Sequence, residues 1–338
     1  MVETRLALFI LLLGVSQQNC LGQSSPTTLS AGVFHVCAVT PGHRVVCWGL
    51  NQHGQLGTTT SQQSLSVPPS PISTTPVVVP GVRGAVSVAA AFSYSCALLD
   101  SGKVVCWGGD STSVREVQGV SGVSALLVGN LGPTNLFCGL LSPGYVCWTG
   151  DGANLVQRNT PIRALGFAVV AGSVFGGIAP CEISQGTTAR CLVGNNQSTS
   201  INAPGQIVQV APFSGGYCTL LNGGSVFCNR PPGAVIPGFS RIQDLRCSGA
   251  FRCLGLDEDG AVTELRLHGN PLSPSTGQIS GLFDVVEVSI SDDFGCAKKS
   301  SGSVFCYGSN ADGQLGRGGN ITHTNDGDLP LGLVVGFP

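Results

Sequence analysis

The residues most able to do chemistry in this chain are its cysteines. There are 15 in 338 residues, too many for a protein in a reducing compartment unless they bind metal. No Cys-x-x-Cys pair occurs, so the ligand spacing of a structural zinc site is missing. Disulfide formation is the chemistry that remains, and we expect neither a metal nor a cofactor.

Most of these cysteines form pairs about ten residues apart. Two residues that flank a tight turn at this spacing can face each other across antiparallel strands. One unit departs, because Glu264 fills its second cysteine position while an extra cysteine lies upstream. We predict one disulfide in each of seven hairpins, namely Cys37–Cys47, Cys96–Cys106, Cys138–Cys147, Cys181–Cys191, Cys218–Cys228, Cys247–Cys253 and Cys296–Cys306.

Residues 1–22 have the features of a secretory signal peptide that is cleaved. Arg5 precedes a short apolar run, and small residues at Cys20 and Gly22 fit the cleavage rule. The run is too short to span a bilayer. Cleavage before Gln23 would also remove Cys20 and leave an even number of cysteines. We therefore expect a secreted or cell-surface protein without a membrane span.

The units around the cysteine pairs repeat at a period of about 40 residues. Each has an apolar strand of small residues, a strand with the first cysteine, a turn and a strand with the second. Val86–Ala91, Ser95–Leu98 and Lys103–Trp107 are an example, with a turn signal at Asp100-Ser101-Gly102. A period of this length built from short strands predicts a β-propeller or a solenoid.

The composition argues against a nucleic-acid partner. Charged residues are only 10% of the chain, and the formal net charge is −2. A phosphate-binding surface needs many lysines and arginines on one face.

Three further segments are expected at the surface. The insertion at 58–80 is rich in Ser, Thr and Pro and free of charge, which predicts an exposed loop, either plain or carrying O-linked sugar. Asn196 and Asn320 begin Asn-x-Ser/Thr sequences and are candidate N-glycosylation sites. The tail at 329–338 is expected to supply an outer strand, with a lipid-anchor signal as the alternative.

Two motifs carry a resemblance to a known repeat. Ser30–Ala38 followed by Val46–Gly57 resembles the regulator-of-chromosome-condensation repeat, and Tyr307–Gly316 repeats its second half. With its paired cysteines, the chain is similar to the extracellular repeats of plant Crinkly-type receptor-like kinases. The resemblance spans Leu29 to about Gly336 and is weak in the fourth and sixth units, which lack the Trp-Gly pair.

This resemblance implies an all-β, seven-bladed β-propeller over residues 23–338, with one disulfide-pinned hairpin in each blade. It also implies the ligand-binding character of a receptor ectodomain. Kinase signatures are absent from the sequence, so kinase activity does not carry over.

Gly-Gln-Leu-Gly loops occur only in the first and last units, which are neighbours in a closed ring. Their polar residues Asn51, Gln55, Asn310 and Gln314 are candidates for a ligand-binding face near the closure point. The alternative is that they brace the loop.

No constellation of residues predicts an enzyme. The five histidines lie in different units or turns, His35 occupies a packing position before Cys37, and Gly-x-Ser-x-Gly is absent. Our leading hypothesis is a recognition module that binds an extracellular peptide or protein, alone or beside an anchored receptor kinase. A secreted propeller enzyme or enzyme inhibitor, and a nuclear exchange factor for a small GTPase, are the alternatives.

Overall fold

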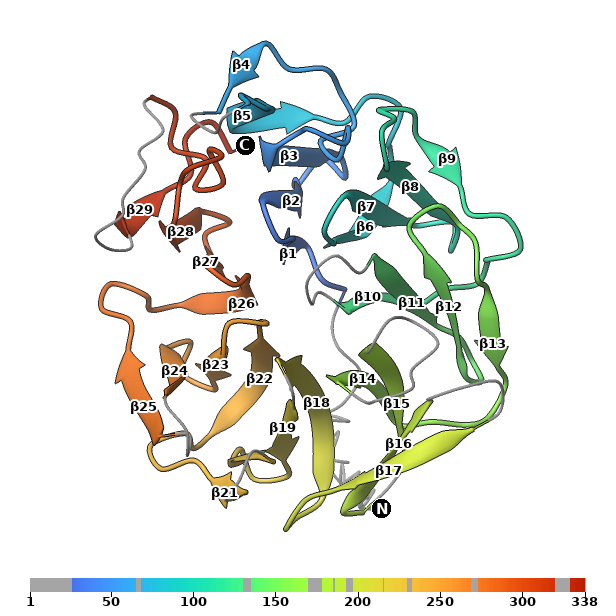
Figure 1. Ribbon diagram of the computed structural model, residues 1–338, viewed down its shortest axis with the longest axis vertical. Coiled ribbons are helices and arrows are strands. Elements are labelled where there is room, and N and C mark those ends of the chain that lie inside the picture. Colours follow the sequence, from blue (N-terminus) through green and yellow to red (C-terminus); the bar gives the residue numbers. More distant parts are fainter. Residues whose placement is uncertain are drawn as a thin grey trace, which may run out of the picture.

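The chain folds as a ring of seven antiparallel sheets around a central axis (Figure 1). The computed structural model describes residues 26–64, 68–129, 135–169, 178–184, 186–192, 197–214, 216–229, 233–268, 273–319 and 329–337. Within these ranges all regular structure is strand, with no helix. The prediction of an all-β, seven-bladed propeller is confirmed.

Each blade runs outward from the axis, in chain order in six blades and in the order β1-β2-β3-β5-β4 in the first. The inner strands are β1 (Leu29–Ala31), β6 (Ala85–Ala90), β10 (Ala125–Gly129), β14 (Ala164–Val169), β18 (Ile207–Phe213), β22 (Ile242–Cys247) and β26 (Val285–Ile290). The second strands are β2 (His35–Val39), β7 (Tyr94–Leu99), β11 (Leu136–Leu140), β15 (Ile178–Ile183), β19 (Gly216–Leu221), β23 (Arg252–Asp257) and β27 (Phe294–Lys299).

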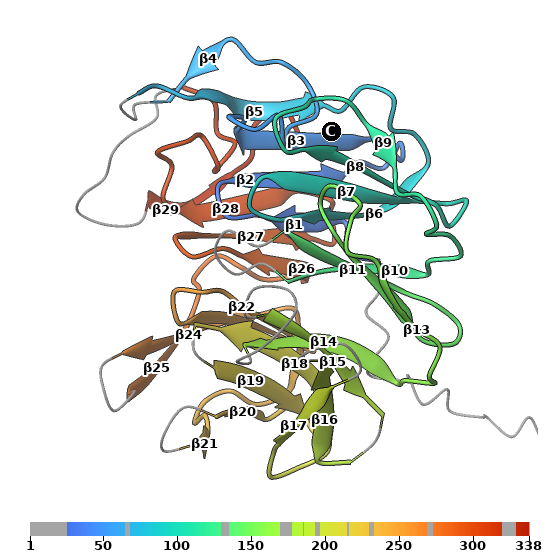
Figure 2. The ribbon, with the colours of Figure 1, turned by 45° about the vertical axis from the view of Figure 1, so that its right-hand side comes forward.

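The third and outer strands complete the blades, and Figure 2 shows outer strands such as β9, β13 and β25 at the rim. The third strands are β3 (Val45–Leu50), β8 (Val104–Gly108), β12 (Tyr145–Thr149), β16 (Thr188–Leu192), β20 (Val226–Cys228), β24 (Val262–His268) and β28 (Val304–Gly308). The outer strands are β5 (Pro71–Val78) with β4 (Gln62–Gln63), β9 (Arg115–Glu116), β13 (Val156–Arg158), β17 (Ser198–Asn202), β21 (Ala234–Val235), β25 (Ser273–Gln278) and β29 (Leu329–Leu333).

The hydrophobic core is divided among the gaps between neighbouring blades. Between the first and second blades, for example, Val45 of β3 packs in one cluster with Val88 of β6 and Trp107 of β8. Small residues on inner strands, such as Ala89 and Ala90, let seven sheets approach the axis. Because each sheet buries its faces against the next, the ring must close to be stable.

The hairpin between the second and third strands sets the cysteine register. In six blades the paired cysteines lie directly opposite each other on these strands, and Cys247 pairs with Cys253 between β22 and β23. All seven predicted disulfides are present. Gly102 has the positive φ of 75° that its turn requires, whereas in the first hairpin His43 takes this conformation, with φ 55°.

In the sixth blade the register differs from our expectation. Leu265 lies opposite Cys253, and Glu264 lies opposite Leu254. Glu264 is therefore not the direct replacement of a cysteine partner.

The insertion at 58–80 is only partly a loop, which corrects the sequence interpretation. Pro71–Val78 forms β5, the outer strand of the first blade, and pairs with both β3 and β4. Ile72 and Val79 are buried. Low charge and many Ser and Thr residues were read as signs of a loop, but an outer strand needs only backbone pairing and one partly buried face.

The tail supplies the outer strand of the seventh blade, as predicted. Leu329–Leu333 pairs with β28. Beyond it, Val334 is 2% exposed in a cluster with Trp48 of the first blade. The Phe337 ring meets the Trp48 ring edge-on, with the centroids 6.3 Å apart. The tail therefore contributes to both of the blades that meet where the ring closes.

The ring closes between β1 and β26, with no strand shared between the first and seventh sheets in the described residues. The Glu287 carboxylate accepts hydrogen bonds from the backbone N–H groups of Thr28 and Leu29, at 2.7 and 3.0 Å. The Ser289 hydroxyl accepts one from the Ala31 N–H at 2.8 Å. Side chains of β26 thus hydrogen-bond to the backbone at β1 and connect the first and seventh blades without a strand that belongs to both sheets.

Some expectations fall on residues that the structure does not describe. The signal peptide at 1–22 and both glycosylation candidates, Asn196 and Asn320, lie outside the described ranges. In the part of the chain that is described, no helix has the length and apolar character needed to cross a membrane.

We expect Val334→Ala to lower the free energy of unfolding by about 1–3 kcal/mol, because it removes buried methyl groups at the closure. Deleting 329–338 should cost more, because it also removes β29. Thermal unfolding measures both, at roughly 2–4 °C per kcal/mol. Val335→Ala, at a site 49% exposed, is the matched control and should leave Tm unchanged. An unchanged Tm after the deletion would show that the tail is not structural.

Candidate ligand-binding cavity

The four polar residues expected to form a ligand face point into their own loops. Asn51 and Asn310 each accept, through the side-chain oxygen, a backbone N–H five residues downstream, at 3.0 Å in both loops. Gln55 and Gln314 each accept the backbone N–H two residues upstream, at 2.8 Å. All four side chains are buried. This geometry favours the alternative, that these side chains brace the loops.

The same loops fasten each blade to the next. The Trp48 indole N–H of the first blade donates to the Gln314 carbonyl of the seventh, at 3.0 Å. The Trp107 indole N–H of the second blade donates to the Gln55 carbonyl of the first, at 2.9 Å. Trp148 of the third blade is equally buried, but its N–H has no hydrogen-bond partner among the described residues. The second blade has no Gly-Gln-Leu-Gly loop to supply one.

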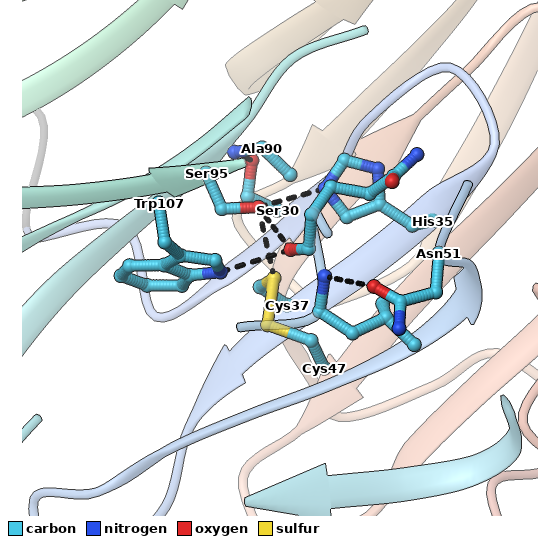
Figure 3. Close-up of a disulfide and its surroundings, with 10 residues drawn as sticks. Ser30, His35, Cys37, Cys47, Asn51, Ala90, Ser95 and Trp107 are labelled. Atoms are coloured by element: carbon cyan, nitrogen blue, oxygen red, sulfur yellow. Dashed lines mark hydrogen bonds between the residues drawn. A yellow bond between two sulfur atoms is a disulfide. The ribbon is translucent and has the colours of Figure 1, made fainter. Parts of the chain in front are cut away.

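His35 and Ser95 form a buried pair beside the Cys37–Cys47 disulfide (Figure 3). The Ser95 hydroxyl donates to the Gln55 carbonyl at 2.9 Å, so its proton is used. His35 Nε2 must then donate to Ser95 Oγ, 2.8 Å away, which fixes the tautomer. Burial lowers the pKa of His35 to about 3, so the ring is neutral.

This pair does not form a hydrolytic site. His35 and Ser95 are both fully buried, so a substrate cannot reach the hydroxyl. In a Ser-His-Asp triad a carboxylate binds the histidine Nδ1, but His35 Nδ1 has no hydrogen-bond partner among the described residues. The packing role expected for His35 agrees with this geometry.

An ion-pair cluster within the sixth blade reaches the seventh blade through Arg252, and the sequence does not predict it. Arg252 lies 2.7 Å from a Glu264 carboxylate oxygen, and Arg266 lies 3.0 Å from the other oxygen. Arg252 also donates to the Asp292 backbone carbonyl at 3.2 Å and faces the Tyr307 ring. Burial is the main cause that raises the pKa of the Tyr307 hydroxyl. These contacts cannot be predicted from the local sequence, because Arg252 meets Glu264 across two strands and meets Asp292 and Tyr307 across two blades.

The structure has a different candidate for a binding site, a cavity of about 510 Å³. It lies where the turns between second and third strands gather, including Asn222–Gly224 and Glu258. Its walls come from blades three to seven and from Pro26 and Thr27 at the start of the described chain. The apolar wall includes Leu127, Leu165, Val208 and Val286, and the polar wall includes Gln209, Asp244, Arg246 and Glu287.

The polar wall is ordered by hydrogen bonds between blades. The Gln209 side chain donates to the Leu245 carbonyl at 2.7 Å and accepts the Leu245 N–H at 3.0 Å, which joins β18 to β22. Arg246 Nε lies 3.0 Å from an Asp244 oxygen, and the Asp244 charge raises the pKa of Arg246. Burial raises the pKa of Glu287, although the N–H donors of Thr28 and Leu29 oppose this shift. These side chains are held in place and can recognise a ligand of matching polarity.

The cavity combines charge with an exposed apolar surface. The Arg246 side chain is 31% exposed and Val286 is 57% exposed. A ligand with a carboxylate or carbonyl beside an apolar group would match this surface. In the described residues, the one cluster with three possible metal ligands is Cys218, Cys247 and Cys253, and all three are in disulfides.

Comparison with known protein families identifies the repeat. Residues 27–55 and 285–314 match one model of the Regulator of chromosome condensation (RCC1) repeat, and residues 43–98 match a second. These segments of the chain are similar to RCC1 repeats. They cover the first blade, the start of the second and the seventh, the blades in which the resemblance was strong.

The sequence likeness to individual RCC1 proteins is local. Residues of this chain are 32% identical over 82 positions to "Protein RCC1" of Candida albicans. The match covers 24% of this chain and 17% of that protein.

Solved structures show the same propeller fold. The Crinkly WD40 ectodomain of the Arabidopsis thaliana receptor kinase ACR4 is similar with a TM-score of 0.54 and 17% identity, over 84% of this chain and 94% of the other. PorZ, a surface component of the type-IX secretion system of Porphyromonas gingivalis, has a TM-score of 0.57 and 11% identity, over 84% of this chain and 37% of the other. At these identities the likeness establishes the fold alone.

The three tryptophans allow the interblade hydrogen bond to be measured. All three are fully buried, so changing each to Phe removes similar volume. We expect Trp48→Phe and Trp107→Phe each to cost about 1 kcal/mol more than Trp148→Phe, because only the first two lose a hydrogen bond. Denaturant unfolding measures the difference. Equal losses for all three variants would show that the loops do not fasten the blades.

The buried His35 predicts a dependence of stability on pH. In the unfolded chain histidine takes up a proton near pH 6.5, whereas the folded chain resists this down to about pH 3. The free energy of unfolding should therefore fall with acidification by roughly 1.4 kcal/mol per pH unit more in the wild type than in His35→Gln, measured between about pH 6 and 4. Identical slopes in the two proteins would contradict the assignment.

Proposed function

We propose that this chain is a secreted or cell-surface recognition module that binds an extracellular peptide or protein in the axial cavity. The observation that carries the proposal is the amphipathic cavity of about 510 Å³, set in a ring with one disulfide in each blade. The bridges favour an oxidising compartment, and the cavity provides a binding site.

The disulfides support an extracellular location. Glutathione and thioredoxin keep most cytosolic thiols reduced, so a structure that depends on seven bridges belongs in the secretory pathway or outside the cell. The signal-peptide pattern at 1–22 and the Asn-x-Ser/Thr sequences at Asn196 and Asn320 agree with this location. The same bridges weigh against a nuclear role as an exchange factor, even though the repeat matches that of RCC1.

The cavity supports recognition of an extended peptide segment. Arg246 would bind a carboxylate or a backbone carbonyl of the ligand, and Gln209 is fixed beside it. Val286, on β26, would contact an apolar side chain. The propeller is similar in fold to the ectodomain of a receptor kinase. A membrane-anchored kinase that responds to the ligand-bound propeller is therefore a compatible partner.

The proposal is tested by selecting ligands from a phage-displayed random-peptide library on the folded protein. Val286→Trp places a large ring in the cavity at an already exposed position. It should weaken binding of the selected peptides by about tenfold or more, equivalent to about 1.4 kcal/mol. Isothermal calorimetry gives the affinities.

Val235→Trp is the matched control, because Val235 is 48% exposed on the outer strand β21 and does not line the cavity. It should bind the selected peptides as the wild type does. Selection of no peptide, or equal affinities for both variants and the wild type, would overturn the cavity as the binding site.

A further inference from the structure

One of the seven disulfides differs from the others in its position and exposure. Six bridges join the second and third strands of a blade, whereas Cys247–Cys253 joins the inner strand β22 to β23. Of the 14 bridged cysteines, Cys247 is the one that is only partly buried, whereas each of the others is at most 4% exposed. It lines the narrow part of the central channel, a cavity of about 100 Å³ formed by all seven inner strands.

A second disulfide, Cys218–Cys228, lies next to Cys247–Cys253. The Sγ atoms of Cys218, Cys247 and Cys253 all lie within 4.8 Å of one another, and Cys218 is bonded to Cys228 in the neighbouring blade. Figure 1 shows β18 and β22 as adjacent inner strands, and the four cysteines belong to one cluster of packed residues. No other group of three cysteine sulfurs is this close in the described part of the chain.

We propose that the Cys247–Cys253 disulfide is a thiol-reactive site at the propeller axis. We also propose that the Cys253 thiolate released when it opens then opens the Cys218–Cys228 disulfide. The reactant is a small extracellular thiol that enters the channel. This reactivity does not require a peptide in the axial cavity, so it stands independently of the proposed function.

The chemistry is two successive thiol–disulfide exchanges. The thiolate attacks Cys247 Sγ, forms a mixed disulfide there and releases the Cys253 thiolate. The Cys253 thiolate then attacks Cys218 Sγ, forms a Cys218–Cys253 bridge and releases Cys228, which takes up a proton. One thiol is consumed and one is produced, so no external oxidant or reductant is needed beyond the entering thiol.

Access explains why this bridge should react first. A disulfide is attacked by a thiolate that reaches one of its sulfurs in line with the S–S bond, so burial protects the bond. The other bridges lie between packed blades and become accessible only when the structure opens locally. The sulfur of Cys247 instead belongs to a residue that borders the channel.

The test uses 2-mercaptoethanol as the thiol on the folded wild-type protein. Samples are quenched in acid, labelled with N-ethylmaleimide and mapped by peptide mass spectrometry. We expect the mercaptoethanol adduct on Cys247 at least about tenfold faster than on any other bridged cysteine, which serve as internal controls. We also expect the maleimide on Cys228 and a new Cys218–Cys253 linkage.

Two outcomes would overturn the proposal. A first adduct on another hairpin cysteine would show that Cys247–Cys253 is not the reactive site. An adduct on Cys247 with the maleimide on Cys253 and an intact Cys218–Cys228 bridge would show that the Cys253 thiolate does not attack the second disulfide.

A variant adds an independent check. Cys247→Ser together with Cys253→Ser should lower adduct formation at least about tenfold, because the one bridge with a partly buried cysteine is gone. Adduct formation at the wild-type rate in this variant would also contradict the proposal. The mapping of the wild-type protein remains decisive if the variant does not fold.

Discussion

Closure of the ring between the first and seventh blades is the constraint on which the rest of this structure depends. Each blade buries its faces against its neighbours, so one open seam would expose core residues of two blades. No strand in the described residues crosses that seam. The chain instead uses hydrogen bonds from Glu287 and Ser289 to the backbone of β1, the loop that carries Gln314, and Val334 against Trp48.

The disulfides act within blades and not across the seam. Each bridge links two strands of a single sheet, so it stabilises the pairing of those strands and makes no link between blades. A closed loop this short restricts the unfolded chain by at most about 3 kcal/mol per bridge. The bridges therefore stabilise individual blades, while the packing and hydrogen bonds between blades make the ring. The Arg252 guanidinium, which Glu264 of the same blade holds in place, adds to this second class through its hydrogen bond to the Asp292 carbonyl of the seventh blade.

Much of the fold could be predicted from the sequence, because a cysteine pair around a tight turn fixes both the hairpin and its register. The displaced register at Glu264 could not, since it depends on the number of residues that the turn accommodates. The outer strand β5 was missed because a half-exposed edge tolerates Ser, Thr and Pro. The burial of Gln55 could not be predicted, because a glutamine side chain can hydrogen-bond either to water or to the backbone of its own loop. The cavity was beyond sequence reasoning, since its walls come from five blades.

We propose that this disulfide-pinned ring works in an oxidising compartment. The most direct test is the intact mass of the native protein, after removal of N-linked sugar, with alkylation before and after reduction. The account predicts no alkylation before reduction, 14 alkylated cysteines after it, and a chain that begins at Gln23. Free thiols before reduction together with a retained Met1 would contradict it.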